Sequence, residues 1–288
     1  MSSVTLESNF VTFGDDFSLL FLRTLRIPED GKIYPLPPGL GEFTLHRVGK
    51  RTPLITQGWH PDDIFLCMYQ REALWLGFEG PSWRPHALKI GIGNINALTG
   101  EVWNETLSST PQNYLVSPPQ PWLDGFHTSN DVVRQFVSAP LGEGLTVESQ
   151  LAAEEAGGLR ITVFEPREGI FPDSPPPAAA PRFDIEQVHL GELGLAAGGE
   201  IHQKIYEDPY GLETWDVENS ATIRVRILNS AQYSLLTGSE PPPTPIDVAT
   251  YIQCGFPWYR IYDEHLSGVE PTDRFRAIKG RGEPDRLD

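Results

Sequence analysis

The sequence predicts a mainly β protein, most simply an antiparallel β-sandwich, either as one unit or as two packed sheet units. Glycine and proline each occur 27 times in 288 residues, above ordinary usage of about 7% and 5%, and both favour turns over helices. Apolar and polar residues also alternate in many short segments, which is typical of strands with one buried face. Signals for helices appear only near the C-terminus.

Period-two alternation locates the predicted strands. In the clearest example, Leu88, Ile90 and Ile92 share one face. The other predicted strands are 17–27, 43–48, 63–69, 72–78, 132–140, 145–151, 159–166, 183–194, 198–211 and 221–229. We expect the third and fourth of these to be halves of one long, bulged segment. The spacing of the strands from 132 to 166 suits a meander.

Capping residues mark short helices late in the chain. Residues 229–238 have Asn229 or Ser230 as a candidate N-cap and Gly238 as a C-terminal stop. A second helix is predicted over 244–255, and Pro257 is suited to begin a further one. The predicted fold therefore ends in one or two short helices.

The strand pattern predicts a single mainly β unit over about residues 15–270. The Pro/Ala-rich stretch within 172–181 favours an extended polyproline conformation, and we interpret it as a surface insertion rather than a boundary between two lobes. Residues 271–288, which contain the basic cluster of Arg274 and its neighbours, are expected to form a flexible tail.

Charge and cysteine content limit the partners and the compartment. The formal charge of −17 repels phosphate backbones and anionic lipids, so we expect neither nucleic-acid nor membrane partners. The N-terminal residues lack the pattern of a signal peptide, and no apolar run is long enough to span a membrane. Two cysteines do not make a disulfide framework. These features predict a soluble cytoplasmic protein with reduced thiols.

The familiar catalytic and cofactor motifs are missing. The sequence has no nucleophile elbow, dinucleotide fingerprint, phosphate-binding loop or zinc-protease motif. Its seven histidines show no metal-ligand spacing. We therefore expect no cofactor and no metal site, and the sequence leaves open whether the chain is an enzyme.

Two acidic and aromatic segments are the best candidates for a site. Residues 207–216 contain Asp208, Tyr210, Trp215 and Asp216 around a predicted turn. Carboxylates beside exposed rings are typical of sugar-binding and glycoside-cleaving clefts, although the same residues also suit an ordinary packed turn.

The second segment is a proline-rich loop, 118–127, that holds Trp122 and Asp124. It has the same ambiguity, because a tryptophan in a loop serves either packing or binding.

The stretch MYQREALWLGFEG, residues 68–80, interrupts a buried strand pattern with charge. Tyr69 and Arg71 are expected on one face of a strand, and Glu72 on the other. We interpret the stretch as scaffold with a buried or partly buried ion pair, in which Arg71 bonds a carboxylate across the sheet. The alternative is that Arg71 contacts a ligand.

Several segments together resemble a family of uncharacterised proteins from bacteria and fungi. They are RTLRIPEDGKIYPLPPGLGEF, MYQREALWLGFEG, PQPWLDG, DVVRQFVSAPLGEGLTVESQ, QKIYEDPYG and GFPWYRIYDE, which follow one another over most of the chain. The resemblance implies one homologous unit. It brings no activity, cofactor or catalytic residue to this sequence.

Three functional hypotheses follow. The first is a binding or protein-interaction module for a protein or small-molecule ligand, with Trp122, Tyr210 and Trp215 in contact with it. The second is a hydrolase, with a carbohydrate as one substrate class, which uses paired carboxylates drawn from Asp124, Asp208 and Asp216. The third is a structural or assembly component.

Overall fold

Alternating apolar residues assemble this chain into two β-sheets, as predicted. The computed structural model describes residues 3–50, 59–152, 154–172, 174, 194–241, 267–275 and 278. The ten-stranded sheet contains β1 (Val4–Leu6), β2 (Phe10–Phe13), β3 (Phe17–Thr24), β4 (Ile33–Tyr34), β5 (Gly39–Glu42), β8 (Ala73–Glu79), β12 (Trp122–Leu123), β13 (Gly125–Ser129), β14 (Val132–Ala139) and β16 (Gly194–His202). The seven-stranded sheet contains β6 (His46–Arg47), β7 (Ile64–Cys67), β9 (His86–Ile92), β10 (Ile95–Asn96), β11 (Leu115–Ser117), β15 (Leu159–Pro166) and β17 (Trp215–Leu228).

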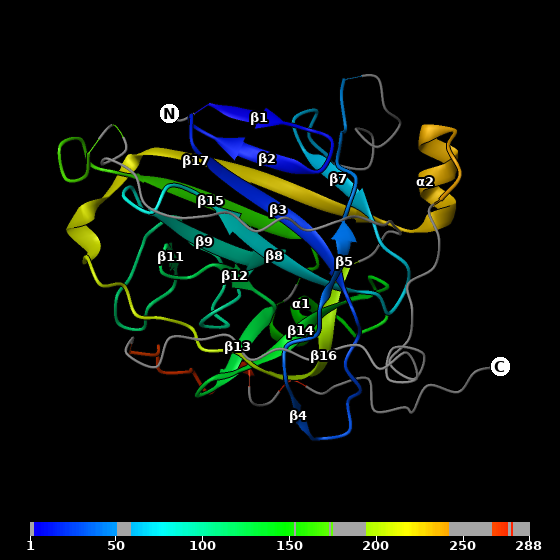
Figure 1. Cartoon of the computed structure of the whole chain (residues 1–288). Helices are drawn as coiled ribbons and strands as arrows, with labels where there is room; N and C mark the ends of the chain where they lie inside the picture. Colours follow the sequence, from blue (N-terminus) through cyan, green and yellow to red (C-terminus); the bar gives the residue numbers. More distant parts are fainter. Residues whose placement is uncertain are drawn as a thin grey trace.

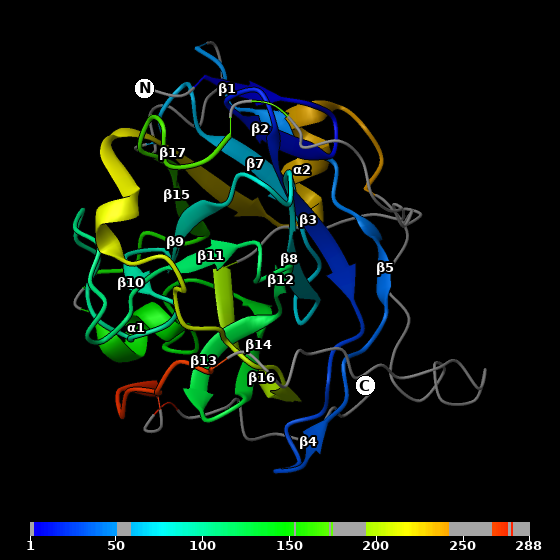
Figure 2. The same cartoon turned by 60° about the vertical axis from the view of Figure 1, so that its left-hand side comes forward.

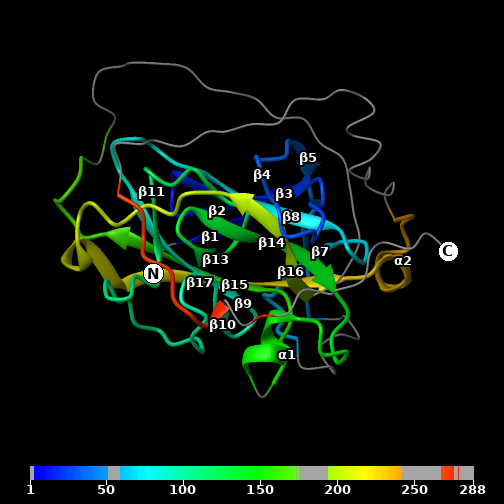
Figure 3. The same ribbon diagram turned by 90° about the horizontal axis from the view of Figure 1, so that it is seen from below.

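The two sheets form the layers of a sandwich around one core. In Figure 1, β3 and β8 lie in front of β9, β15 and β17. Figure 3, seen from below, places β3, β4 and β5 above β9, β10, β15 and β17. The largest apolar cluster draws on both layers, with Phe21 and Leu76 from one sheet and Ile90, Ile161 and Ile223 from the other. Within the described residues the mainly β prediction is therefore confirmed.

Most neighbouring strands are antiparallel, with two exceptions. The order is β1-β2-β3-β8-β14-β16-β4 in one sheet and β10-β9-β15-β17-β7-β6 in the other. β4 runs parallel to β16, and β7 runs parallel to β17. Both exceptions join strands that lie far apart in the sequence, where a hairpin cannot set the direction.

The segment that was expected to be one long strand passes from one sheet to the other. β7 ends at Cys67 in the seven-stranded sheet, and β8 begins at Ala73 in the ten-stranded sheet. Arg71 lies in the turn between them with φ of 71°, so the predicted sharing of a strand face by Tyr69 and Arg71 is wrong.

A buried ion pair is present in this stretch. It joins the side chains of Glu72 and Arg23, both almost fully buried, and Glu72 also accepts a hydrogen bond from the Tyr69 amide at 2.8 Å. Burial raises the pKa of Glu72, while the charge of Arg23 opposes that shift. The stretch therefore contains a buried ion pair, as interpreted, and this pair joins Glu72 to Arg23.

The expected meander over 132–166 is also wrong. β14 and β15 belong to different sheets, and the segment between them forms α1 (Val147–Leu151) instead of a strand. The Thr146 hydroxyl caps this helix by accepting from the Ser149 amide. The cap residue overrides the strand-like alternation of the five residues that follow.

The predicted helix near 229–238 is confirmed. α2 (Ser230–Thr237) has Asn229 as its N-cap and Gly238 as its left-handed C-cap. Tyr233 of this helix packs in a small cluster with Phe65 and Cys67 of β7, and Figure 2 shows α2 beside that strand. The helices predicted over 244–255 and after Pro257 lie outside the described residues.

The packed unit differs from the predicted limits at both ends. β1 and β2 precede residue 15 and belong to the ten-stranded sheet. Phe275 and Ile278, from the predicted tail, are 1% and 6% exposed in the main core. Most of the insertion predicted at 172–181 lies outside the described residues. Across the described ranges, no helix is long and apolar enough to cross a membrane.

Candidate functional site

The outer face of the seven-stranded sheet holds the first candidate site. Ile161 and Ile223 pair across β15 and β17 and point into the core. Because side chains alternate along a strand, the neighbours Arg160, Thr162 and Arg224 point outward. The strand pattern therefore separates an apolar inner face from an outer face with charge and hydroxyl groups.

An aromatic cluster covers one end of this outer face. Its buried members are Ala87, Tyr114, Val116, Phe164 and Trp215. Four strands supply all but Tyr114, which directly precedes β11, since Ala87 lies on β9, Val116 on β11, Phe164 on β15 and Trp215 on β17. Trp215 begins β17 and is paired with Pro166 at the end of β15. The cluster is thus built on the strands of the sheet rather than on a loose loop.

Asp208 fixes the turn that lies over this cluster. Its Oδ2 accepts hydrogen bonds from the Tyr114 hydroxyl at 2.5 Å and from Trp215 Nε1 at 2.9 Å. Its Oδ1 accepts from the Tyr210 amide at 2.8 Å. Burial and the Asp208 carboxylate raise the pKa of Tyr114, so that hydroxyl stays a donor. Three donors hold one carboxylate, which makes the turn rigid.

The rigid turn presents one exposed ring. Tyr210 is 41% exposed, and its ring meets Phe171 edge-on at 5.1 Å and 88°. Trp215 meets the same ring at 6.1 Å and 84°. Edge-to-face contacts of this kind are favourable, so Tyr210 is held in place while much of its surface faces solvent.

Cations gather farther along the same face. Arg160 and Arg224 stand opposite each other on β15 and β17. Trp103 lies between two of the cations, with Lys89 Nζ 5.3 Å and the Arg160 guanidinium 4.8 Å from its ring centre. Gly91 makes room for this ring, because a Cβ there would lie 2.8 Å from Trp103.

Lys89 is buried beneath this cationic region. Its Nζ donates to Asn104 Oδ1 at 2.8 Å and also to the Thr106 carbonyl. Burial lowers its pKa to about 8, and the nearby acidic groups Glu105 and Glu101 oppose the shift. In the same cross-strand row as Lys89, the hydroxyls of Thr162 and Thr222 hydrogen bond at 2.8 Å.

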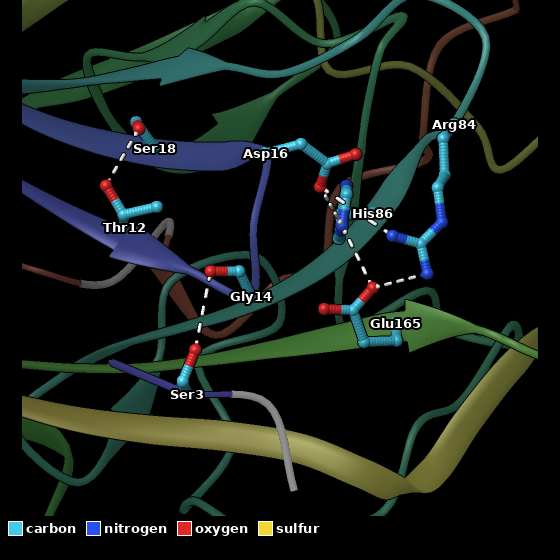
Figure 4. Close-up of polar contacts among 8 residues, drawn as sticks. All are labelled: Ser3, Thr12, Gly14, Asp16, Ser18, Arg84, His86 and Glu165. Atoms are coloured by element: carbon cyan, nitrogen blue, oxygen red, sulfur yellow. Dashed lines mark hydrogen bonds and ion pairs between the residues drawn. The ribbon is translucent and has the colours of Figure 1, made fainter. Parts of the chain in front are cut away.

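A second polar cluster lies on the inner side of the same strands. Figure 4 shows Asp16, Arg84, His86 and Glu165 together. His86 Nε2 lies 3.2 Å from Glu165 Oε2 and 3.7 Å from Asp16 Oδ1. Arg84 reaches the same carboxylates at 3.1 Å and 3.7 Å. Asp16 follows β2, and the other three come from β9, its preceding loop and β15, so the cluster joins the two sheets.

The inner cluster contains the groups of an acid–base site, but His86 and Glu165 are too buried for a substrate to reach them. The His86 side chain is 0% exposed and packs on Phe17 at 4.8 Å. Its Nδ1 has no hydrogen-bond partner in the part of the chain that the structure describes, so no hydroxyl or thiol of that part is bonded to it. Arg84 forms ion pairs with both carboxylates, and the described residues contain no group of three or more ligands that could hold a metal. The cluster therefore links the two sheets through buried polar contacts.

The candidates from 118–127 lie in the ten-stranded sheet. Trp122 pairs with Gly77 of β8, and its ring meets Trp75 edge-on at 6.5 Å. Asp124 is 3% exposed, and burial raises its pKa to about 7, opposed by a hydrogen bond from the Trp122 side chain. No described residue donates a hydrogen bond to its Oδ2. This carboxyl is buried rather than placed in an open cleft.

The structure brings some predicted site residues together and separates others. Asp208, Tyr210 and Trp215 form one cluster, and the half-buried Asp216 follows it, accepting from the Glu218 amide at 3.1 Å. Trp122 and Asp124 form another, on the other sheet, and Arg71 lies in the turn between β7 and β8. Trp215 is fully buried, so it supports the exposed ring instead of contacting a ligand.

Several residues of interest were missed by sequence reasoning. They are Asp16, Arg84, His86, Lys89, Trp103, Arg160, Glu165 and Arg224. Alternation does place Arg160 and Arg224 on outer faces, but the sequence does not say which strands pair. In the comparison with known proteins, no family model, curated protein or solved structure matches this chain.

Proposed function

We propose that this chain is a binding module whose ligand lies on the outer face of the seven-stranded sheet. The observation that carries the proposal is the exposed ring of Tyr210, which Asp208, Phe171 and Trp215 hold in one position. A ring that is already fixed loses little conformational freedom when a ligand binds, so more of the contact energy appears as affinity. Large aromatic side chains in such positions often dominate binding.

The shape and chemistry of this end of the sheet favour a ligand with a flat, partly apolar face. A sugar ring has such a face together with hydroxyl groups, and the tyrosine presents both a ring and a hydroxyl. The carbohydrate class therefore suits Tyr210 better than a purely aliphatic ligand does. We further propose a cytoplasmic location, which agrees with the buried free thiol of Cys67.

Binding is favoured over hydrolysis by the state of the predicted carboxylates. A glycosidase needs two carboxyl groups that face each other at about 5–10 Å across a substrate. Asp208 is already engaged by three donors, and Asp124 lies buried beside β12 of the other sheet. Neither is free to act on a bond in a ligand that contacts Tyr210.

Calorimetry on two substitutions at position 210 tests the proposal. The probes are cello-oligosaccharides and oligogalacturonates, which are both chains of pyranose rings but differ in charge. Tyr210→Ala should weaken binding of the preferred probe about tenfold, while Tyr210→Phe should keep most of the affinity. Tyr34→Ala, which removes a tyrosine from the ten-stranded sheet, is the matched control. Equal affinities of Tyr210→Ala and the unmodified chain would contradict the proposal.

A further inference from the structure

The middle of the same outer face carries positive charge that the sheet does not balance. Arg160 and Arg224 lie directly opposite each other, and like charges in that position destabilise a sheet. The arrangement is unexpected in a chain with 39 acidic and only 22 basic residues. A negative group between the two guanidinium groups would turn this repulsion into attraction.

The two arginines have little competition for such a group. Arg224 is exposed and makes no ion pair with any described residue. Arg160 bonds Glu105, whose side chain is 67% exposed, and surface pairs of this kind contribute little. Burial and the charge of Arg224 both lower the pKa of Arg160, and only Glu105 opposes them.

Unused donors surround the same position. Arg160 Nε and Trp103 Nε1 are buried N–H groups that find no acceptor among the described residues. Lys89 adds a third cation below them, and it is bonded only to neutral oxygens. Covered donors do not contact a ligand directly, but their positive ends strengthen the field at the surface. The region therefore has an excess of donors as well as of charge.

We propose, building on the binding function above, that the ligand is an acidic oligosaccharide whose carboxylate or sulfate group lies between Arg160 and Arg224. Pro166, beside Trp215, and Arg160 are six residues apart on β15, which corresponds to about 20 Å at 3.3 Å per residue. An elongated ligand spans this distance with one ring face on Tyr210. A densely charged polyanion does not suit the site, because the chain as a whole carries −17.

Calorimetry with oligogalacturonate and with its methyl ester, which has the same rings without the charge, tests this proposal. The unmodified chain should bind the acid at least tenfold more tightly than the ester. Arg224→Gln should remove about that tenfold for the acid and leave the ester unchanged. Lys32→Gln, an exposed cation on the ten-stranded sheet, is the matched control for net charge. Glu105→Gln should tighten binding of the acid, because it frees Arg160.

The outcomes separate the two proposals. Equal affinity for acid and ester, with no effect of Arg224→Gln, would overturn the anion site while leaving Tyr210 as a binding residue. Loss of the acid preference in Lys32→Gln as well would assign it to net charge and overturn the site. Tighter binding of tetraglutamate than of oligogalacturonate would overturn the sugar class, and tighter binding of dextran sulfate would overturn the limit on charge density. Failure of Tyr210→Ala to affect either galacturonate probe would contradict the proposed function instead.

Discussion

The charged groups on the inner side of β9 and β15 are paired with one another, whereas two arginines on the outer side face each other. On the inner side, the Arg84 guanidinium and the His86 ring lie between two carboxylates, and each has a carboxylate oxygen within 4 Å. On the outer side, Arg160 faces Arg224, and the nearest carboxylate, on Glu105, is largely exposed. The two regions share β9 and β15, and the side chains of these strands alternate between them.

This difference indicates different roles. A cluster between two sheets in which each charged group has a partner contributes to the fold by itself, although its net gain is limited by desolvation. An unbalanced cluster at the surface costs stability unless something else completes it. Substitutions on the inner side should therefore act mainly on unfolding, and substitutions on the outer side mainly on binding.

The largest effect is expected from Glu165→Ala in the inner cluster. The change removes the carboxylate that His86 contacts at 3.2 Å and Arg84 at 3.1 Å. Removing one partner of a buried pair costs about 3–5 kcal/mol, and we expect about 3 kcal/mol because Arg84 is partly exposed. Urea unfolding measures it, with Glu155→Ala in the loop after α1 as a control. A loss of unfolding free energy below about 0.5 kcal/mol, the level of an ordinary surface substitution, would show that the cluster does not stabilise the contact between the sheets.

Asp124 is a buried carboxyl group that should destabilise the chain when it is charged. The pKa of Asp124 is raised from 3.8 to about 7 by burial, so its contribution to stability is present below pH 3.8 and is lost as the pH rises through 7. Asp124→Asn removes this loss. The variant should match the unmodified chain near pH 4 and exceed it at pH 8 by about 2 kcal/mol. That is half of the ~4 kcal/mol that the full shift implies, because relaxation around a buried charge lowers its cost.

Unfolding curves of both chains at pH 4, 6 and 8 give the measurement for Asp124. The difference between them should grow steadily over this range. A constant difference at all three pH values would mean that the carboxyl keeps an ordinary pKa, and that a charge at this position is compensated after all.

Lys89→Met tests the buried cation of the outer side. Burial lowers the pKa of Lys89 from 10.5 to about 8, so its contribution is present above pH 10.5 and is lost as the pH falls through 8. The unmodified chain should therefore gain about 1 kcal/mol over the variant between pH 7 and pH 10, after allowance for screening. Thermal unfolding over this range measures the gain. Parallel pH curves for the two chains would contradict it.

The sequence predicted the sheet face on which a side chain lies far better than it predicted which strands pair. Alternation placed Ile223 inward and Arg224 outward, because that pattern is local to one strand. Opposition of Arg160 and Arg224 depends on strands more than fifty residues apart, and nothing local sets that pairing. His86 was missed for the same reason, since its partners come from a hairpin and from a distant strand. Asp208 and Tyr210 were found because a turn brings sequence neighbours together.

The smallest effect, and the most direct test of the contrast, is Arg224→Gln without ligand. Removing one of two opposed like charges should stabilise the chain by about 0.3 kcal/mol at low salt, within the range for cross-strand pairs. The gain should disappear in molar salt, where screening acts within about 3 Å. Precise urea titrations at the two salt concentrations measure it. A loss of stability in the variant would mean that Arg224 has a structural partner, and the outer face would then be as balanced as the inner one.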